Sequence, residues 1–140
     1  MQRYAVTATR LNGHGTRTVC KDAVLVADTD PAGREDAFNP AELLLAAVTA
    51  CMIKGGMERV TPILGFSLRG ASVTLYAERQ DVPPRIVRTG YEIVIDTDEP
   101  DRRLELLHDN IRKYGTISNT IAASVPLEGM LGRAAAPVSA

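Results

Sequence analysis

The sequence predicts an α+β domain with a largely antiparallel sheet and a long, buried central helix. Short alternating strands come in groups, two long helical segments separate these groups, and the strict strand–helix–strand alternation of a parallel α/β fold is missing. At 140 residues the chain is expected to form one domain over residues 1–132. Residues 133–140 are rich in Ala and Pro and are expected to form a flexible tail.

Three strands are expected at the start of the chain. Residues 3–9 alternate apolar and polar side chains, and the sequence NGHG at 12–15 supplies the positive-φ residues of a hairpin. The second strand then covers residues 16–20, and the third covers 23–27. A polar loop with Asp, Pro and Gly follows over residues 28–38.

The first helix is predicted over residues 40–59, with a kink at the glycine pair 55–56. Asn39 is a typical N-cap, Pro40 suits the first turn, and Glu42 stands three residues after the cap, where its carboxylate can reach back to the Asn39 backbone. The run LLLAAV that follows is apolar on almost every face. One sheet covers such a helix from one side only, so we expect a second subunit to cover the other.

The second half of the chain predicts a hairpin, two helical segments and a last strand. Alternation around residues 73–77 and 91–95, with a turn at 81–84, predicts the hairpin. A helix from about residue 100 to Tyr114 carries Leu104, Leu107 and Ile111 on one stripe, and Gly115 is expected at its C′ position. Further helical turns over 116–123 and a strand over 125–131 complete the expected order.

Composition excludes several classes of function. The formal net charge is −1 with scattered basic residues, so no nucleic-acid partner is expected. Cys20 and Cys51 form no CxxC pair, and His14 and His108 lie far from both in sequence, so no metal or cofactor is expected. The longest uncharged apolar run falls short of the ~20 residues that span a bilayer. The protein is therefore expected in the cytoplasm, with reduced thiols and no membrane association.

Cys51 lies within the uncharged part of the first helix. A thiol in such a position is by default a small inert hydrophobe. It lies well beyond the first turn, where the helix dipole stabilises a thiolate, so a reactive sulfur there needs a side-chain cation. Lys54, three residues later on the helix, and Arg17, in the second strand, are the candidates.

Two motifs carry a resemblance to a known family. The sequence NPAELLLAA at 39–47, followed by Cys51, and the sequence KYGTISNT at 113–120 resemble the OsmC/Ohr family, and the similarity covers about residues 3–131. The resemblance implies an OsmC-like fold in an intertwined homodimer, with active sites at the interface, and a thiol-dependent peroxidase that reduces organic hydroperoxides. It implies that Cys51 attacks the peroxide and that Arg17 holds Cys51 as a thiolate.

The chain departs from the family pattern at two positions. The second cysteine of the family, which resolves the oxidised site by forming a disulfide, falls on Gly115. The family's catalytic glutamate falls on Ala41, and Glu42 stands one position later, about 180° around a regular helix from Cys51. Glu42 is therefore assigned to the helix cap, with a supporting role at the site left open. Both departures resemble an OsmC-like branch that lacks the second cysteine.

Other polar residues are less suited to the site than Cys51 and Arg17. Cys20 is the one other thiol, but its odd spacing from Arg17 on a strand puts the two on opposite faces unless a bulge intervenes. A solvated helix face accounts for His108 and Lys113. Ser118 and Asn119 match the family motif but are also ordinary helix-cap residues, so a local structural role is expected for both.

The sequence supports a one-cysteine peroxidase. Cys51, supported by Arg17, would form a sulfenic acid that an external thiol must reduce. The apolar residues around Cys51 favour an organic peroxide. The alternative is a non-catalytic OsmC-like module that binds a ligand or senses redox state, with Cys51 as a core or ligand-site residue.

Overall fold

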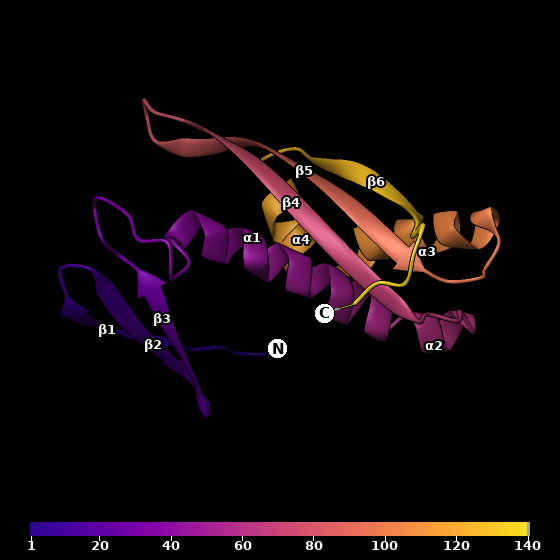
Figure 1. Ribbon diagram of the computed structural model, residues 1–140, viewed down its shortest axis with the longest axis horizontal. Helices are drawn as coiled ribbons and strands as arrows, with labels where there is room; N and C mark the ends of the chain where they lie inside the picture. The colour runs from indigo at the N-terminus through magenta and orange to yellow at the C-terminus, as the bar shows by residue number, and fades with distance from the viewer. Residues whose placement is uncertain (140) are drawn as a thin grey trace. The chain divides into compact units, whose positions relative to one another are not determined.

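The computed structural model describes residues 1–139, and it divides into two compact units, Met1–Leu44 and a second unit that begins at Leu45 (Figure 1). Each unit contains a three-stranded sheet, with strand order β1-β2-β3 in the first and β4-β5-β6 in the second. The predicted α+β class is confirmed. The sequence had suggested one sheet, whereas the described residues form two.

The first unit is an antiparallel sheet of β1 (Thr7–Asn12), β2 (Gly15–Cys20) and β3 (Ala23–Asp28). β1 begins four residues later than residue 3, where the alternation begins. The ladder between β2 and β3 runs without interruption from Gly15 to Cys20. No bulge therefore separates Arg17 from Cys20, and the two side chains lie on opposite faces of β2.

The loop after β3 is organised by Asp28. Its carboxylate accepts hydrogen bonds from the backbone N–H groups of Asp30, at 2.9 Å, and Arg34, at 3.0 Å. The backbone N–H of Ala32 and the His14 ring, which also bonds the Asp30 carboxylate, hold the pKa of Asp30 below its usual value. Phe38 then returns to pair with Ala27. These bonds fix the route by which the chain reaches the first helix.

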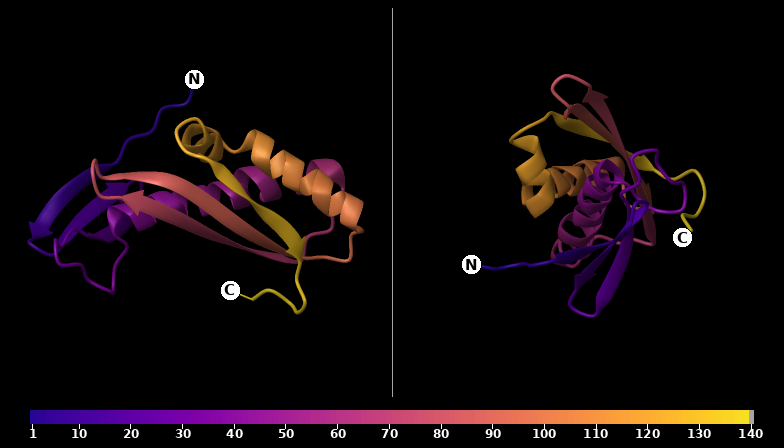
Figure 2. Two further views of the ribbon diagram at one scale, coloured as in Figure 1. Left: turned by 90° about the horizontal axis from the view of Figure 1, so that it is seen from above. Right: turned by 90° about the vertical axis from the view of Figure 1, so that its left-hand side faces the viewer.

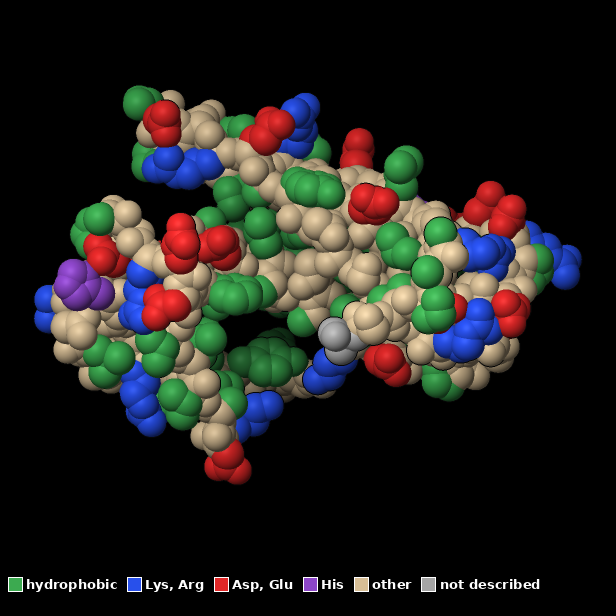
Figure 3. All heavy atoms as spheres, in the orientation of Figure 1, with side chains coloured by type: hydrophobic (Ala, Val, Ile, Leu, Met, Phe, Trp, Pro, Cys, Tyr) green, Lys and Arg blue, Asp and Glu red, His purple; other side chains and the backbone are tan. Residues whose placement is uncertain are grey.

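The first unit exposes many apolar side chains. Figure 3 shows hydrophobic side chains at the surface of its sheet. Monomeric soluble proteins rarely leave a large contiguous apolar surface open to water. The large exposed apolar side chains of this unit are Met1, Tyr4, Val6, Leu11, Val24, Leu25, Val26, Phe38 and Leu44.

The predicted long helix is a composite of different helical types. α1 (Pro40–Cys51) leads directly into a π-helix, η1 (Met52–Glu58), and a short helix, α2 (Thr61–Leu64), follows. The wide turn is seen in the bond from the Arg59 N–H to the Lys54 carbonyl, five residues earlier, at 3.1 Å. The predicted kink at residues 55–56 is thus a π-helix. The predicted end near residue 59 matches the end of η1 at Glu58, and Thr61 then begins α2.

The second sheet combines antiparallel and parallel pairing. β4 (Gly70–Gln80) and β5 (Arg85–Asp96) form the predicted long hairpin, and β6 (Leu127–Arg133) pairs with β5 in parallel. Parallel pairing follows from the long crossover between β5 and β6, which contains two helices. Among the residues described, β4 and β6 are the edges of this sheet, and each has one strand neighbour. β6 ends at Arg133, one residue beyond the predicted domain boundary.

The core of the second unit lies between its sheet and its helices. α3 (Asp101–Tyr114) and α4 (Thr116–Ala122) lie on one face of the sheet (Figure 2). The predicted apolar stripe of α3 is confirmed, because all three of its side chains are buried. In α1, by contrast, only Val48 is buried. The buried core consists of Val48, Met52, Met57, Phe66, Tyr91, Ile93, Ile95, Leu104, Leu107 and Ile111.

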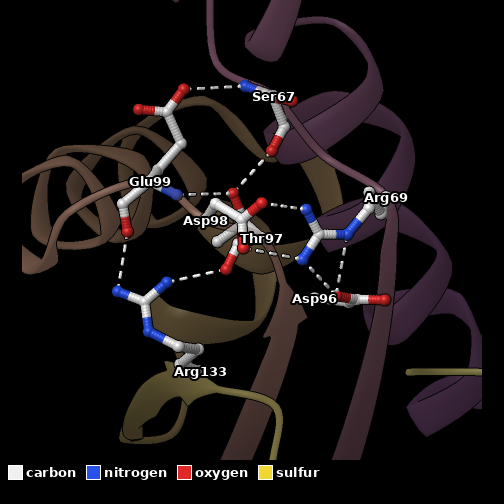
Figure 4. A network of polar contacts seen from close by, with 7 residues as sticks. All are labelled: Ser67, Arg69, Asp96, Thr97, Asp98, Glu99 and Arg133. Carbon is white, nitrogen blue, oxygen red and sulfur yellow. Dashed lines mark hydrogen bonds and ion pairs between the residues drawn. The ribbon is translucent and has the colours of Figure 1, made fainter. Parts of the chain in front are cut away.

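A polar network secures one end of the second sheet (Figure 4). Arg69 lies between the carboxylates of Asp96, at 2.9 Å, and Asp98, at 2.7 Å, which raise the pKa of the Arg69 guanidinium. Arg133 donates to the carbonyls of Thr97, at 2.7 Å, and Glu99, at 2.6 Å. These bonds join the ends of β4, β5 and β6 to the start of α3, so they fix where the helix leaves the sheet.

One segment of the described chain, Pro40–Leu64, is long and apolar enough to cross a membrane by length and composition. The sequence expectation rested on the shorter run without any charge, whereas this segment includes a few charged residues. About one fifth of its most apolar window, 22%, is buried. An apolar helix that its own chain leaves uncovered needs another apolar surface to cover it.

Candidate functional site

Cys51 is the last residue of α1 and stands directly before the π-helix. Its side chain is partly buried, and its sulfur accepts a hydrogen bond from the backbone N–H of Ile117 at 3.3 Å. Ile117 lies in the first turn of α4, where backbone N–H groups have no partner within the helix. A thiolate accepts such a bond more strongly than a thiol does. No sequence pattern indicated this donor, because it lies 66 residues away along the chain.

Gly115 lies against the Cys51 sulfur. A Cβ atom built on Gly115 would lie 3.2 Å from Cys51 Sγ. In a disulfide the distance from a Cβ to the sulfur across the bond is about 3 Å, given an S–S bond of about 2.04 Å. The position that corresponds to the family's second cysteine is therefore at disulfide distance from Cys51, and it carries no thiol.

Position 115 favours glycine because there is little room for a side chain, and not because the backbone has an unusual angle. Gly115 directly follows α3 and precedes α4 as its N-cap, and its φ of −82° is not the left-handed conformation usual for a glycine at the C′ position. The same imagined Cβ would lie 2.9 Å from Ser118 Oγ, closer than such contacts occur. Gly55 of the π-helix also approaches this point, since its own imagined Cβ is 4.0 Å from the Gly115 Cα. The backbone of η1 thus approaches the junction between α3 and α4.

Arg17 and Cys20 belong to the first unit, whereas Cys51 belongs to the second. Arg17 is exposed on β2, opposite Thr9 and Val26. The action of Arg17 on the Cys51 sulfur stays a prediction. Both cysteines are free thiols.

Glu42 completes the predicted cap at the start of α1. The Asn39 N–H donates to Glu42 Oε1 at 3.0 Å, and the Glu42 N–H donates to Asn39 Oδ1 at 2.9 Å. This reciprocal pair is the capping box that the sequence predicted. Lys54 is exposed within the π-helix, where the wider turn changes the angular spacing assumed for a regular helix. A supporting role for Lys54 therefore also stays a prediction.

The sequence had suggested that His108 lies on a solvated helix face, whereas in the structure His108 is partly buried. Its Nε2 is 2.6 Å from the Tyr91 hydroxyl, and the two rings pack edge to face with centroids 5.7 Å apart. Burial, and then the positive charge of Arg112, lower the pKa of His108. Burial raises the pKa of Tyr91. His108 stands four residues after Leu104 on the apolar side of α3, and this spacing was the signal that it is partly buried.

The residues assigned to local capping have different roles. Asn119 donates to the Lys113 carbonyl at 3.1 Å, which is the expected local role. Ser118 is 3% exposed, and its hydroxyl has no hydrogen-bond partner among the described residues, so Ser118 makes no capping bond there. Lys113 is exposed, with its ammonium 5.1 Å from the centre of the Tyr114 ring. Across residues 1–139, no cluster of three or more His, Cys, Asp or Glu side chains is placed to hold a metal ion.

Comparisons with known proteins show the family of the chain. The model of the family described as OsmC-like protein matches residues 33–129. No curated protein matches the sequence. Among solved structures, an OsmC-like protein from Mycoplasma pneumoniae is similar with a TM-score of 0.86 at 14% identity, over 94% of this chain and 97% of that one.

Two further structures are of proteins named for organic hydroperoxide resistance. The OsmC protein from Legionella pneumophila has a TM-score of 0.70 at 20% identity, and it covers 94% of this chain and 98% of its own. OhrB of Bacillus subtilis has a TM-score of 0.66 at 19% identity, with the same coverage of 94% and 98%. The match to the family model covers well over half of the sequence, and the chain therefore belongs to the OsmC-like protein family.

Proposed function

We propose that this protein is a cytoplasmic, thiol-dependent peroxidase that reduces organic hydroperoxides through Cys51 alone. One observation carries the proposal: the Cys51 sulfur accepts a backbone N–H, while the position at disulfide distance from it is glycine. Membership in the OsmC-like family and the likeness to hydroperoxide resistance proteins support the choice of reaction. The apolar residues Val48 and Met52 nearby favour an organic peroxide.

The proposed reaction has an oxidative and a reductive half. The Cys51 thiolate attacks the outer oxygen of the hydroperoxide, an S–O bond forms, and the O–O bond breaks. The alkoxide leaves, takes a proton from water and departs as the alcohol, while Cys51 remains as a sulfenic acid. An external thiol then displaces the hydroxyl as water and forms a mixed disulfide. A second thiol attacks its outer sulfur, which releases reduced Cys51 and the oxidised reductant.

Arg17 is proposed to favour the thiolate form of Cys51, with its guanidinium near the sulfur in a homodimer. Lys54 is a secondary candidate for the same role. Glu42 Oε1 accepts the capping hydrogen bond from the Asn39 N–H at the start of α1. If Glu42 also supports the chemistry, the same carboxylate has to perform both roles.

Mass spectrometry of peroxide-treated protein tests the proposal. Treatment with an organic hydroperoxide and a sulfenate-selective reagent is expected to label Cys51, and turnover is expected to require added thiol. Cys20→Ser should turn over at the parent rate, because Cys20 faces away from Arg17 on β2. Cys51→Ser should be inactive.

Two results contradict the proposal in different ways. A disulfide between Cys20 and Cys51 as the main product means that the protein uses two cysteines. A Cys51 that stays reduced under excess hydroperoxide favours the alternative, a non-catalytic module that binds a ligand or senses redox state.

A further inference from the structure

Ser118 carries a buried hydroxyl group that has no partner among the described residues. The residue is 3% exposed, and its Oγ makes no hydrogen bond there. A buried polar group without a partner is costly, and nearly all such groups in native proteins have one. Ser118 directly follows Ile117, whose N–H donates to the Cys51 sulfur. The residue after the known donor thus carries a second donor that is unused.

The Ser118 hydroxyl lies close to the Cys51 sulfur. Ser118 Oγ and Cys51 Sγ are 2.9 Å and 3.2 Å from the same point, the place that a Cβ on Gly115 would take. The two atoms are therefore at most about 6 Å apart. An oxygen added to the sulfur and turned toward Ser118 narrows this gap by the length of an S–O bond. It brings the two groups toward the distance of an O–H···O hydrogen bond, about 2.5–3.0 Å.

The reductive half of the proposed reaction needs the oxygen on this side of the sulfur. An incoming thiolate attacks the Cys51 sulfur in line with the S–O bond, from the side opposite to the oxygen. Cys51 is only partly buried, so the thiol reaches the sulfur from its exposed side. The leaving oxygen then points into the protein, where the Ser118 hydroxyl is buried.

We infer that the Ser118 hydroxyl binds the oxygen of oxidised Cys51 and assists its departure when an external thiol reduces the sulfenic acid. The thiolate forms an S–S bond with Cys51, the S–O bond breaks, and the oxygen leaves as hydroxide with both electrons of that bond. The hydroxide takes a proton from the solvent and becomes water. The Ser118 O–H donates to the oxygen, most strongly as negative charge develops on it.

Ser118 is then a catalytic residue of the reductive half only. In the oxidative half, negative charge develops on the departing alkoxide and not on the oxygen that joins the sulfur, so the hydroxyl contributes little there. The inference deepens the proposed function and rests on it for the oxidation of Cys51. Because the two halves can be measured separately, a failure of one is distinguishable from a failure of the other.

Single-turnover kinetics of the full-length protein tests this role. Oxidation by one equivalent of cumene hydroperoxide gives the first rate. Reduction of the sulfenic acid by 2-mercaptoethanol gives the second, measured by mass spectrometry as the mixed disulfide on Cys51. Ser118→Ala is expected to lower the second rate at least about tenfold, as the loss of a donor to a developing charge does. It should change the first rate by less than about twofold.

Ser124→Ala is the matched control for this substitution. It makes the same change at an exposed serine two residues after the end of α4. Both rates should be the same in this variant as in the parent. An equal loss in the second rate for both variants would mean that the effect does not come from the hydroxyl beside the sulfur, and would overturn the inference.

The stability of the reduced protein tests whether the hydroxyl is unpaired. Ser118→Ala removes a buried polar group that has no partner, so the midpoint of urea unfolding should stay the same or rise. The same measurement shows that the variant is folded. A lower midpoint would mean that the hydroxyl is already paired in the reduced protein, which contradicts the inference.

The combined results separate the role of Ser118 from the proposed function. Equal reduction rates in the parent and in Ser118→Ala would refute the role of Ser118 and leave the peroxidase. If hydrogen peroxide oxidises Cys51 and Ser118→Ala slows its reduction, but no organic hydroperoxide is turned over, the peroxidase is refuted and the role of Ser118 stands. A Cys51 that stays reduced under an excess of either peroxide would refute both.

Discussion

Replacing Gly115 by cysteine is expected to give Cys51 a disulfide partner. The imagined Cβ of residue 115 lies 3.2 Å from the Cys51 sulfur, which suits a disulfide. Gly115→Cys should therefore form an intramolecular disulfide with Cys51 after one equivalent of peroxide, and a sulfenate-selective reagent should no longer label Cys51. Peptide mapping by mass spectrometry measures both.

Gly115→Ala is the control for this change. It adds the same Cβ next to Ser118 without a thiol, so it isolates the steric cost at that contact, where the imagined Cβ is 2.9 Å from Ser118 Oγ. Sulfenic acid should still be trapped in this variant. Failure of Gly115→Cys to form the disulfide, with the control folded, would show that the backbone at residue 115 is not held where the structure places it.

Arg17→Met is expected to shift the alkylation of Cys51 to higher pH. The proposed guanidinium near the sulfur favours the thiolate, which is the form that reacts. The rate of iodoacetamide alkylation against pH measures the shift. Arg10→Met is the matched control, because Arg10 pairs with Thr16 and so lies on the opposite face of the same sheet. A profile that is the same in the parent and in Arg17→Met would remove Arg17 from the site.

Local chemistry made part of the site predictable from sequence. The cap between Asn39 and Glu42 depends on residues three apart, and its bonds are as predicted. The place of Gly115 beside Cys51 came from the resemblance. The N–H of Ile117 and the unpaired hydroxyl of Ser118 could not be predicted, because both depend on where α4 packs rather than on any pattern within it.

At the scale of elements, the π-helix depends on close packing against α3. A Cβ on Gly56 would lie 2.7 Å from Ile111 Cγ1, whereas a Cβ on Gly55 would make only ordinary contacts, the nearest at 3.7 Å. Gly56→Ala is therefore expected to lower the free energy of unfolding by about 1–3 kcal/mol through overpacking. Urea unfolding followed by circular dichroism measures the change.

Gly55→Ala is the matched control for the same helix. It should leave the free energy of unfolding unchanged or raise it by up to about 1 kcal/mol, because alanine favours helix where there is room for it. Equal effects of the two substitutions would mean that α3 does not pack on η1 at Gly56.

The sequence predicted those elements whose side chains follow a regular spacing. The three-residue stripe of α3 and the hairpin of β4 and β5 follow from side-chain spacing, and both are present. The sequence predicted a kink where the structure has a π-helix. Two adjacent glycines indicate that a helix is weakened at that point, but they do not indicate which geometry the backbone adopts there. The parallel direction of β6 follows from the path of α3 and α4, which its own residues do not encode.

At the scale of the whole molecule, we expect an obligate homodimer. Only Val48 of α1 is buried, and the β1–β3 unit exposes apolar side chains along its strands. Obligate interfaces commonly bury more than ~2,000 Å² in total. Sedimentation at micromolar concentration is expected to show a dimer. A stable monomer under these conditions would contradict the prediction.

A pair of matched substitutions locates the interface. Leu44 in α1 is 38% exposed and Leu106 in α3 is 40% exposed, so the two leucines are equally accessible in a single chain. Leu44→Lys is expected to shift the equilibrium toward monomer, and Leu106→Lys is not. Dissociation by Leu106→Lys alone would place the interface on α3 instead of α1.

The open edges of the β4-β5-β6 sheet have a consequence for the newly made chain. β4 is eleven residues long and β6 seven, and each leaves one side of its backbone without a strand neighbour in the described chain. Exposed strand edges are templates for aggregation, which natural proteins avoid by covering or charging them. In β4 such charges stand only near one end, at Glu78 and Arg79, and β6 carries Glu128 and Arg133. Chains that remain unassembled for long are therefore at risk of aggregation. Slow expression at low temperature should therefore raise the soluble yield.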